Sequence, residues 1–340
     1  MTGAARAGAP PAVAFEDVSI LFGGAQEEAL RLADEGRGRE EIRAGTGCVL
    51  GVHGADLVVG RGETLVLMGL SGSGKSTLLR AVNGLNPVAR GRVVLDGEVE
   101  VSAAKGAALR RIRAERVAMV FQQFGLLPWR TVADNVGLGL ELSGMKRAAR
   151  AAKVEEQLAL VGLEGQGARP VGELSGGMQQ RVGLARAFAT EAPILLMDEP
   201  FSALDPLIRA HLQDELMELQ DRLQRTIVFV SHDLAEAFRI GDRIAIMEGG
   251  RIVQVGTPRE IYADPASEYV ANFVAHMNPA DVLVAADVMT DGAADGPSLE
   301  SDAPLGEVMA LLGDAPVVRV TRAGAPVGRI ERADVLRRLA

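Results

Sequence analysis

The stretch Gly69-Leu70-Ser71-Gly72-Ser73-Gly74-Lys75-Ser76-Thr77 decides the fold, because it matches the pattern G-x-x-x-x-G-K-[ST] of a phosphate-binding P-loop. The apolar run 64–68 before it predicts a strand, and the run 76–82 after it predicts a helix. Glycines let backbone N–H groups turn toward phosphate oxygens, and the helix adds the positive end of its dipole. We therefore expect this strand–loop–helix unit to bind a nucleotide.

Two side chains of this loop have expected chemical roles. Lys75 is expected to bridge the β- and γ-phosphates as a compact cation, and Ser76 to offer its hydroxyl to Mg²⁺. In a chain with 40 glycines a chance match is the alternative, and the flanking strand and helix weigh against it. The expected ATP site in this loop comprises Gly69, Ser71, Gly72, Ser73, Gly74, Lys75, Ser76 and Thr77.

Composition limits the other function classes. A chain of 340 residues with 48% hydrophobic and 24% charged residues predicts a folded core, in one large domain with a smaller one or in two domains. The net charge of −9 does not favour general nucleic-acid affinity. Cys48 is the single cysteine, so no internal disulfide forms, which fits a reducing cytoplasm. No signal peptide is evident and no apolar run approaches the ~18 residues of a membrane span, so we expect a soluble chain.

Strand and helix patterns alternate along the centre of the chain, which predicts an α/β fold with a mostly parallel sheet covered on both faces. Strands are predicted at 13–22, 49–59, 117–121, 194–197, 226–230, 243–247 and 251–255, with a hairpin over 92–99 around an Asp-Gly turn. Helices are predicted at 109–115, 131–161 with a break near Gly144, 178–189 and 206–223. The polar stretch 25–47 has helical character in two places.

A second pattern places two acids at the carboxyl end of a strand. The run Ile194-Leu195-Leu196-Met197-Asp198-Glu199 is apolar until its last two residues, and an α/β sheet binds its ligands at this edge. Asp198 fits a Mg²⁺ ligand, direct or through water, and Glu199 fits the group that polarises an attacking water. The alternative is a strand that merely ends in a charged turn.

A third pattern predicts a second anion-binding helix end. In Leu174-Ser175-Gly176-Gly177-Met178-Gln179-Gln180-Arg181 a Ser-Gly-Gly turn opens a helix. The P-loop already holds the phosphates of its own chain, so this second cradle fits the ATP of another subunit. We therefore expect a head-to-tail dimer with two sandwiched nucleotides, in which Ser175, Gly176 and Gly177 act in trans.

The motifs GLSGSGKST, LSGGMQQR and ILLMDEP, in this order, resemble the ATP-binding-cassette (ABC) ATPases. The resemblance implies a P-loop NTPase fold with a mostly parallel core sheet, an antiparallel β subdomain and a helical signature subdomain at about 125–180. It also implies hydrolysis of ATP with Mg²⁺ as the cofactor.

The same resemblance implies roles for residues outside these three motifs. Gln122 stands where the family's Q-loop glutamine contacts Mg²⁺ and senses the membrane subunit, and His232 resembles the switch histidine at the γ-phosphate. Ser202–Asp205 resembles the D-loop, which puts Asp205 at the partner's nucleotide. Phe22 stands where the family stacks an aromatic ring on adenine, although a Phe that ends a strand is more often a core residue. The implied catalytic residues are Glu199, His232, Gln122 and Lys75, and the implied Mg²⁺ ligands are Ser76, Gln122 and Asp198.

The insertion at 25–47, together with LVLMGLSGSGKSTLLRAVNGL and RTIVFVSHDLAEAFRIGDRIAIM, is similar to the ATPases of quaternary-amine importers, and 82–87 looks closest to the choline branch. This implies uptake of choline, glycine betaine or proline betaine across a bacterial inner membrane, with this chain as a peripheral subunit on the cytoplasmic face. The implied partners are a second copy, an integral-membrane permease and, without direct contact, an extracytoplasmic solute-binding protein; nucleic acid is not among them. The alternatives are an importer of another amino acid or osmolyte, and a soluble ABC ATPase that acts on DNA or ribosomes. A nucleotide sensor without turnover is a third, against which Glu199 and His232 argue.

The end of the chain reads as a small separate segment. A linker at 291–304 leads to a helix at 305–312, strands at 317–320 and 327–330 and a helix at 332–339, an order similar to one CBS motif. Importers of the betaine branch commonly carry two such motifs in tandem, and this chain has room for one. We therefore expect an ATPase domain over 1–279 and a CBS-like regulatory segment over 280–340.

Overall fold

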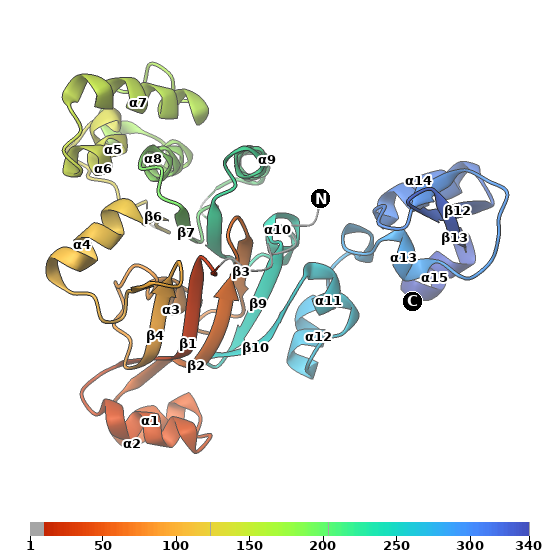
Figure 1. The fold of residues 1–340 in the computed structure, drawn as a ribbon, viewed down its shortest axis with the longest axis horizontal. Coiled ribbons are helices and arrows are strands. Elements are labelled where there is room, and N and C mark those ends of the chain that lie inside the picture. The colour runs from red at the N-terminus through yellow and green to blue at the C-terminus, as the bar shows by residue number, and fades with distance from the viewer. Residues whose placement is uncertain (1–9, 123, 203, 340) are drawn as a thin grey trace. The chain divides into compact units, whose positions relative to one another are not determined.

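The computed structural model describes residues 10–122, 124–202 and 204–339 (Figure 1). Residues 1–9 of the expected ATPase domain, Gln123 beside the Q-loop glutamine, Ala203 of the expected D-loop and Ala340 lie outside the described residues. Contacts divide the chain into two compact units. The first comprises the residues up to Asp233 together with Ile240–Val255, and the second comprises Leu234–Arg239 and Gly256–Ala340. The second unit thus starts before residue 280, and the domain boundary at 279/280 stays a prediction.

A six-stranded sheet in the order β10-β9-β3-β8-β7-β6 forms the centre of the first unit. The strands are β3 (Thr64–Met68), β6 (Val117–Val120), β7 (Ile194–Asp198), β8 (Thr226–Val230), β9 (Arg243–Glu248) and β10 (Arg251–Gly256). Strand β3 pairs in parallel with β8 and β9, and β7 pairs in parallel with β6 and β8. Every residue of β3, β7 and β8 is buried, as in a parallel sheet covered on both faces. The predicted α/β fold is confirmed.

An antiparallel sheet in the order β2-β1-β4-β5 lies against this core. Its strands are β1 (Val13–Phe22), β2 (Val49–Val59), β4 (Arg90–Leu95) and β5 (Val99–Glu100). Asp96 and Gly97 join β4 to β5 with φ of 55° and 75°, the positive values that a tight hairpin turn requires at both central positions. One apolar core cluster includes buried side chains from β1, β2 and β4 together with others from β3, β7, β8 and β9. The two sheets therefore share one hydrophobic core.

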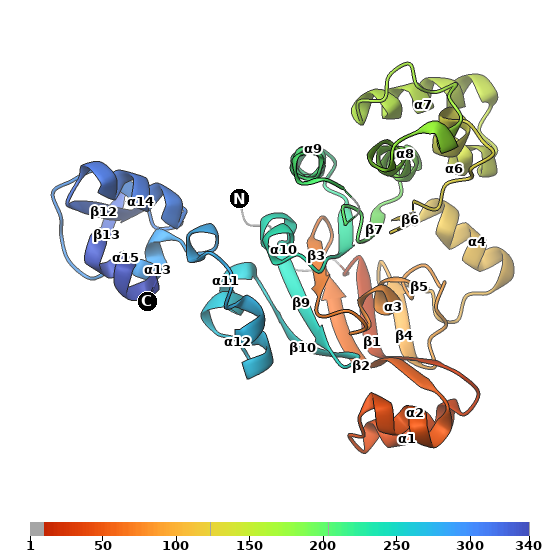
Figure 2. The same ribbon diagram turned by 180° about the vertical axis from the view of Figure 1, so that it is seen from behind.

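Helices cover and extend the first unit. They are α3 (Lys75–Leu79), α4 (Gly106–Glu115), α5 (Val132–Val136), α6 (Leu138–Leu142), α7 (Arg147–Leu160), α8 (Gly176–Ala189) and α9 (Pro206–Leu223), with a 3-10 turn over Val171–Glu173. Helix α10 (Leu234–Ile240) belongs to the second unit except for its last residue. Figures 1 and 2 show α5–α8 grouped on one side of the core sheet and the antiparallel strands on the other. The predicted break near Gly144 in the helical stretch 131–161 is confirmed, since α6 ends at Leu142 and α7 starts at Arg147. A second break at Gly137, between α5 and α6, was not predicted.

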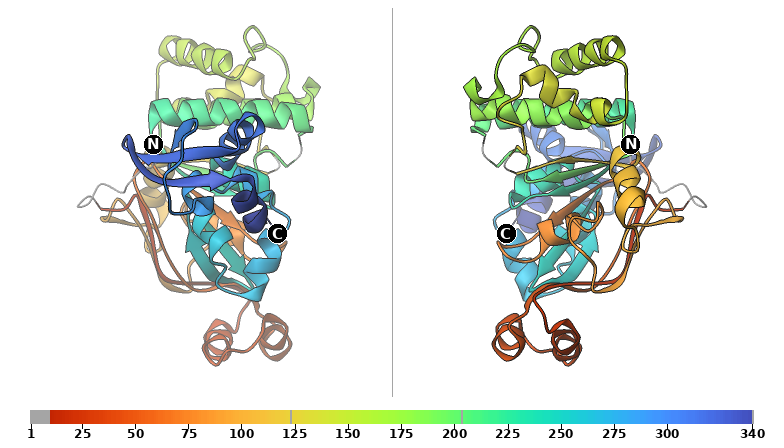
Figure 3. Two further views of the ribbon diagram at one scale, coloured as in Figure 1. Left: turned by 90° about the vertical axis from the view of Figure 1, so that its right-hand side faces the viewer. Right: turned by 90° about the vertical axis from the view of Figure 1, so that its left-hand side faces the viewer.

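The insertion between β1 and β2 forms a helical hairpin of α1 (Gln26–Asp34) and α2 (Arg39–Thr46). Figure 3 shows the two helices side by side at the end of the antiparallel strands. They bury a small apolar cluster of their own against β1 and β2, made of Leu21, Ala29, Ala33, Ile42, Cys48 and Leu50. The insertion is therefore an ordered part of the first unit.

The second unit contains α11 (Pro258–Ala263), α12 (Glu268–Val274), α13 (Ala285–Val288), β11 (Ser298–Glu300), α14 (Leu305–Asp314), β12 (Val317–Arg322), β13 (Ala325–Glu331) and α15 (Arg332–Leu339), with a 3-10 turn over Pro279–Asp281. Strand β11 pairs in parallel with β12, and β12 pairs antiparallel with β13. The sequence predicted a linker where β11 lies, because three residues with two exposed side chains give no apolar pattern. Within the described residues, no helix has the length and apolar character needed to cross a membrane.

Candidate active site

The P-loop follows β3 and turns sharply into α3. Gly69 has φ of +137°, and a Cβ there would lie 2.1 Å from the carbonyl oxygen of Met247 in β9. Gly74 has φ of +106°, and a Cβ there would lie 2.5 Å from the carbonyl oxygen of Gly51 in β2. Only glycine fits at both positions, because the backbone is left-handed and two neighbouring strands approach it closely. The loop is thus enclosed by both sheets.

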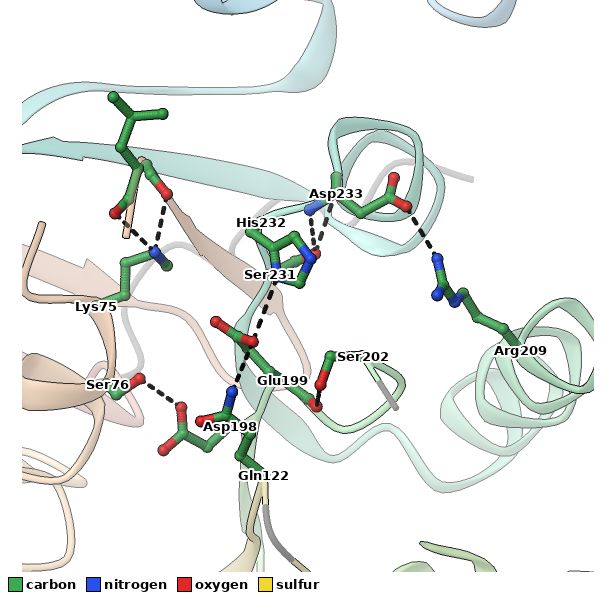
Figure 4. Close-up of polar contacts among 12 residues, drawn as sticks. Lys75, Ser76, Gln122, Asp198, Glu199, Ser202, Arg209, Ser231, His232 and Asp233 are labelled. Carbon is green, nitrogen blue, oxygen red and sulfur yellow. Dashed lines mark hydrogen bonds and ion pairs between the residues drawn. The ribbon is translucent and has the colours of Figure 1, made fainter. Parts of the chain in front are cut away.

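Lys75 lies at the start of α3 with its ammonium group inside the loop (Figure 4). Its Nζ donates to the carbonyl oxygens of Gly69 at 2.8 Å and Leu70 at 3.1 Å. The side chain is 5% exposed, and burial lowers its pKa, while the nearby carboxylates of Glu199 and Asp198 act in the opposite direction. Lys75, the residue expected to bind the phosphates, therefore lies within the P-loop.

Asp198 ends β7 and is fully buried. Ser76 Oγ donates to its Oδ1 at 2.6 Å, and the Arg80 guanidinium donates to its Oδ2 through Nε at 3.0 Å and Nη2 at 2.8 Å. The buried carboxylate is therefore compensated on both oxygens. The sequence analysis missed Arg80, although its spacing of four from Ser76 places both side chains on one helix face and could have indicated it.

Glu199 follows Asp198 in a left-handed backbone conformation with φ of +47°, which is strained for a residue with a side chain. Its Oε2 accepts from Gln122 Nε2 at 2.9 Å and lies 3.3 Å from His232 Nδ1. Figure 4 shows these three side chains converging. Gln122 follows β6 and His232 follows β8, so the carboxyl ends of three adjacent parallel strands bring them together.

Further contacts fix the loops that carry these groups. Ser202 Oγ donates to the backbone carbonyl of Glu199 at 3.0 Å. Asp233 N donates to Ser231 Oγ at 2.9 Å and closes a turn around His232. The Arg209 guanidinium of α9 lies 3.3 Å from the Asp233 carboxylate, so α9 is linked to the same turn. No pattern in the sequence pointed to this last contact.

The donor set fits a magnesium ion. Ser76 and Asp198 place a hydroxyl and a carboxylate side by side, and Gln122, just after the neighbouring strand β6, adds an amide oxygen. Within the described part of the chain there is no cluster of three or more His, Cys, Asp or Glu that could hold a metal by itself. Mg²⁺ commonly binds through one or two carboxylates with substrate phosphates and water, so this sparse oxygen set suits a nucleotide-borne Mg²⁺.

Phe22 ends β1 beside the loop and is 40% exposed. A Cβ added to Gly51 would meet Thr77 Cγ2 at 2.9 Å and Phe22 Cε2 at 3.1 Å, so the ring and the Thr77 methyl group approach Gly51 closely. Ser71 and Gly72 are exposed on the loop, whereas Ser73 is buried. A partly exposed ring next to the P-loop provides a surface on which a base can stack.

The residues expected to act in trans lie elsewhere in the unit. Ser175 caps α8 and accepts from Met178 N at 3.3 Å, and Asp205 caps α9 and accepts from Ile208 N at 3.1 Å. Gly176 and Gly177 form the first turn of α8, and Figures 1 and 2 show α8 apart from α3. The structure does not bring these four residues to the P-loop of the same chain.

Known proteins are similar to this chain over most of its length. The family model described as "ABC transporter" matches residues 52–202. The glycine betaine transport ATP-binding protein OpuAA of Bacillus subtilis is 48% identical over 280 residues, 82% of this chain and 67% of that protein. The glycine betaine/proline betaine transport system ATP-binding protein ProV of Escherichia coli is 51% identical over 268 residues, 79% and 67% of the two chains. The trimethylamine N-oxide transport system ATP-binding protein TmoW of Ruegeria pomeroyi is 41% identical over 329 residues, 96% of both chains.

Two solved structures of the ATP-binding cassette MJ0796 have the same fold. One is a dimeric post-hydrolysis state bound to ADP and Pi, with a TM-score of 0.62, 29% identity and coverage of 72% of this chain and 98% of that chain. The other is a dimer with the same TM-score and coverage and 30% identity. The chain therefore belongs to the ATP-hydrolysing ATP-binding proteins of ABC transporters, in the branch that contains the glycine betaine and trimethylamine N-oxide transport proteins.

Proposed function

We propose that this chain hydrolyses ATP to energise uptake of a quaternary amine, glycine betaine, proline betaine or choline, through a permease in the bacterial cytoplasmic membrane. This chain docks on the cytoplasmic face of that permease. A solute-binding protein on the opposite side of the membrane completes the transporter and does not contact this chain. The observation that carries the proposal is the convergence of Gln122 and His232 on Glu199 next to the P-loop, in a chain about half identical to betaine-transport proteins. The assignment to the choline branch stays a prediction.

Glu199 is the proposed general base. Gln122 Nε2 and His232 Nδ1 both lie against Oε2, so we assign Oε1 as the oxygen that accepts the proton from water. A water that donates its proton to Oε1 attacks the γ-phosphorus in line with the leaving oxygen. Lys75 stabilises the negative charge that develops on the phosphates, and His232 lies close enough to contact the transferred group.

Ser76 and Asp198, with Gln122, are the residues proposed to hold Mg²⁺. When bound with ATP, this ion supplies neutralisation of the phosphate charge. Ser76 Oγ and Asp198 Oδ1 are hydrogen-bonded to each other, so the two oxygens are already adjacent. Phe22 is the proposed stacking surface for adenine.

A second copy completes the proposed site. Ser175, Gly176 and Gly177 at the start of α8, with Asp205 at the start of α9, face the ATP held by the partner's P-loop. The dimeric state of the solved relatives supports this arrangement. The positive end of α8 then lies near the partner's γ-phosphate and favours its charge.

The test is uptake in proteoliposomes that contain the permease, the binding protein and this chain, with ATP on the side of the ATPase. We expect uptake of labelled glycine betaine that requires ATP, and competition with unlabelled choline and proline betaine identifies the preferred amine. A complex that hydrolyses ATP and takes up none of these amines contradicts the substrate class. Uptake of another amino acid or osmolyte by that complex supports the second candidate.

A further inference from the structure

The α1–α2 hairpin is fixed on the antiparallel sheet by more than its apolar cluster. Asp34 at the end of α1 accepts from the Arg90 guanidinium of β4 at 2.9 and 2.8 Å, and lies 3.4 Å from His53 Nε2 of β2. Arg251 Nη2 of β10 donates to the Ala33 carbonyl oxygen at 2.8 Å. Polar contacts from three strands therefore hold the hairpin in place.

Arg39, the first residue of α2, extends from this hairpin to the P-loop. Its Nη1 donates to the carbonyl oxygen of Gly72, and its Nη2 donates to the carbonyl oxygen of Gly51 and lies 3.5 Å from that of Ser73. The guanidinium is half-buried, and this burial lowers its pKa. Within the described residues its partners are carbonyl groups and no carboxylate neutralises it. A half-buried positive charge thus lies against the carbonyl groups of the loop.

These contacts determine how the loop presents its N–H groups. In a trans peptide the C=O and the following N–H point in opposite directions. When Arg39 holds the carbonyls of Gly72 and Ser73 on its own side, the N–H of Gly74 points to the other side, while the N–H of Ser73 donates to the Leu70 carbonyl oxygen across the loop at 3.1 Å. The Ser73 carbonyl also accepts from Gly250 N at 3.0 Å, which strengthens the same orientation. Inward-pointing N–H groups of this kind form the cradle for phosphate oxygens.

We propose that Arg39 is a positioning residue that holds the P-loop in its phosphate-binding shape before ATP arrives, and that this is the role of the 25–47 insertion. The inference rests on the proposed nucleotide site in the P-loop. A loop that is already ordered loses less conformational freedom on binding, so the affinity for ATP is higher. The Arg39 fork joins two carbonyl groups of different segments, a geometry that a lysine ammonium on a flexible stem does not reproduce.

The experiment measures MgATP affinity of the full chain by calorimetry, and KM and kcat for hydrolysis in the assembled transporter. Arg39→Met removes the fork and keeps most of the apolar stem, and Arg39→Lys keeps the charge. Arg43→Met, at an exposed position one turn further along α2, is the matched control for loss of charge. We expect the Kd and KM of Arg39→Met to rise roughly tenfold to a hundredfold, as for loss of a charged hydrogen-bonding group. We expect kcat at saturating ATP to stay within about threefold of wild type, because Arg39 does not contact Glu199, Gln122 or His232.

Each outcome decides the proposal. Arg39→Lys that binds as weakly as Arg39→Met supports positioning by the fork, whereas Arg39→Lys with wild-type affinity shows that charge alone suffices and overturns it. Equal losses in Arg39→Met and Arg43→Met, or wild-type affinity in Arg39→Met, also overturn it. If Arg39→Met does not fold, the comparison of Arg39→Lys with wild type remains decisive. Lys75→Ala distinguishes failure of the Arg39 proposal from failure of the nucleotide site. If Lys75→Ala binds MgATP like wild type, the proposed nucleotide site itself is wrong.

Discussion

Glu199 is the residue whose chemistry is most directly testable. Glu199→Gln keeps the shape of the side chain and its tolerance of the left-handed backbone, and removes the basic oxygen. We expect ATP to bind as before and hydrolysis to fall by about 10²- to 10⁴-fold, the usual contribution of a general base. The measurement is steady-state phosphate release beside nucleotide affinity. His211→Gln, at an exposed position of α9, serves as control. Turnover of Glu199→Gln within about tenfold of wild type places the base elsewhere.

Individual residues differ in how far the sequence reveals them. The placement of Asp198 and Glu199 is predictable, because a buried strand delivers its last residues to the ligand edge of a parallel sheet. The contacts of Arg39 are not, because they join residues 33 positions apart through side-chain geometry that no local pattern encodes. For Arg80 the spacing from Ser76 is a local signal, but its partner Asp198 lies 118 positions away. The backbone strain at Glu199 is also not predictable from the sequence, because its φ angle depends on the conformation of the turn that follows β7.

At the scale of elements, the support of the α1–α2 hairpin predicts a pH dependence of stability. His53 is 5% exposed, and its pKa is lowered by burial and further by Arg251 and Arg90, while Asp34 and Asp17 act in the opposite direction. The folded protein therefore keeps His53 neutral below pH 6.5, where the unfolded chain binds a proton. We expect the free energy of unfolding to decrease as the pH falls from 6.5 toward the lowered pKa, by at most about 1.4 kcal/mol per pH unit for this proton.

Urea denaturation at several pH values, with wild type and His53→Gln compared, measures this slope. The substitution should flatten the profile below pH 6.5. Parallel profiles for wild type and His53→Gln would mean that His53 is protonated in the folded protein as readily as in the unfolded chain.

Strands and helices with clear periodicity were predictable as elements, and short or glycine-interrupted ones were not. The predicted range 206–223 agrees with α9, because Asp205 caps the helix and Pro206 is a favoured first residue. The Ser-Gly-Gly turn correctly predicted the helix start at Ser175, whereas the predicted range 178–189 starts two residues late because two glycines are weak helix formers. Strand β11 exists through its pairing with β12, which lies about twenty residues later in the chain, outside any local window.

At the scale of the whole molecule, the proposed dimer predicts a particular result for mixed subunits. A Lys75→Ala subunit is paired with a Ser175→Arg subunit, each with its own affinity tag. In a head-to-tail sandwich one composite site carries both substitutions and the other carries none, so one site per heterodimer should trap nucleotide. The two homodimers, with one substitution in each site, are the controls and should trap none. A heterodimer that assembles and traps no nucleotide argues that each site is built within one chain.

The hairpin of β9 and β10 closes the P-loop from a point far along the chain. The position where a Gly69 side chain would lie is filled by the Met247 carbonyl, the Ser73 carbonyl accepts from Gly250 N, and β3 pairs with β9. During synthesis the complete P-loop sequence GLSGSGKST therefore leaves the ribosome long before β9 and β10, the strands that it packs against, have been made. A nascent chain that ends before residue 247 contains the P-loop sequence but lacks the contacts that hold the loop in its native conformation. Because ATP binds the native state, it can stabilise this protein during folding only after that late hairpin has emerged.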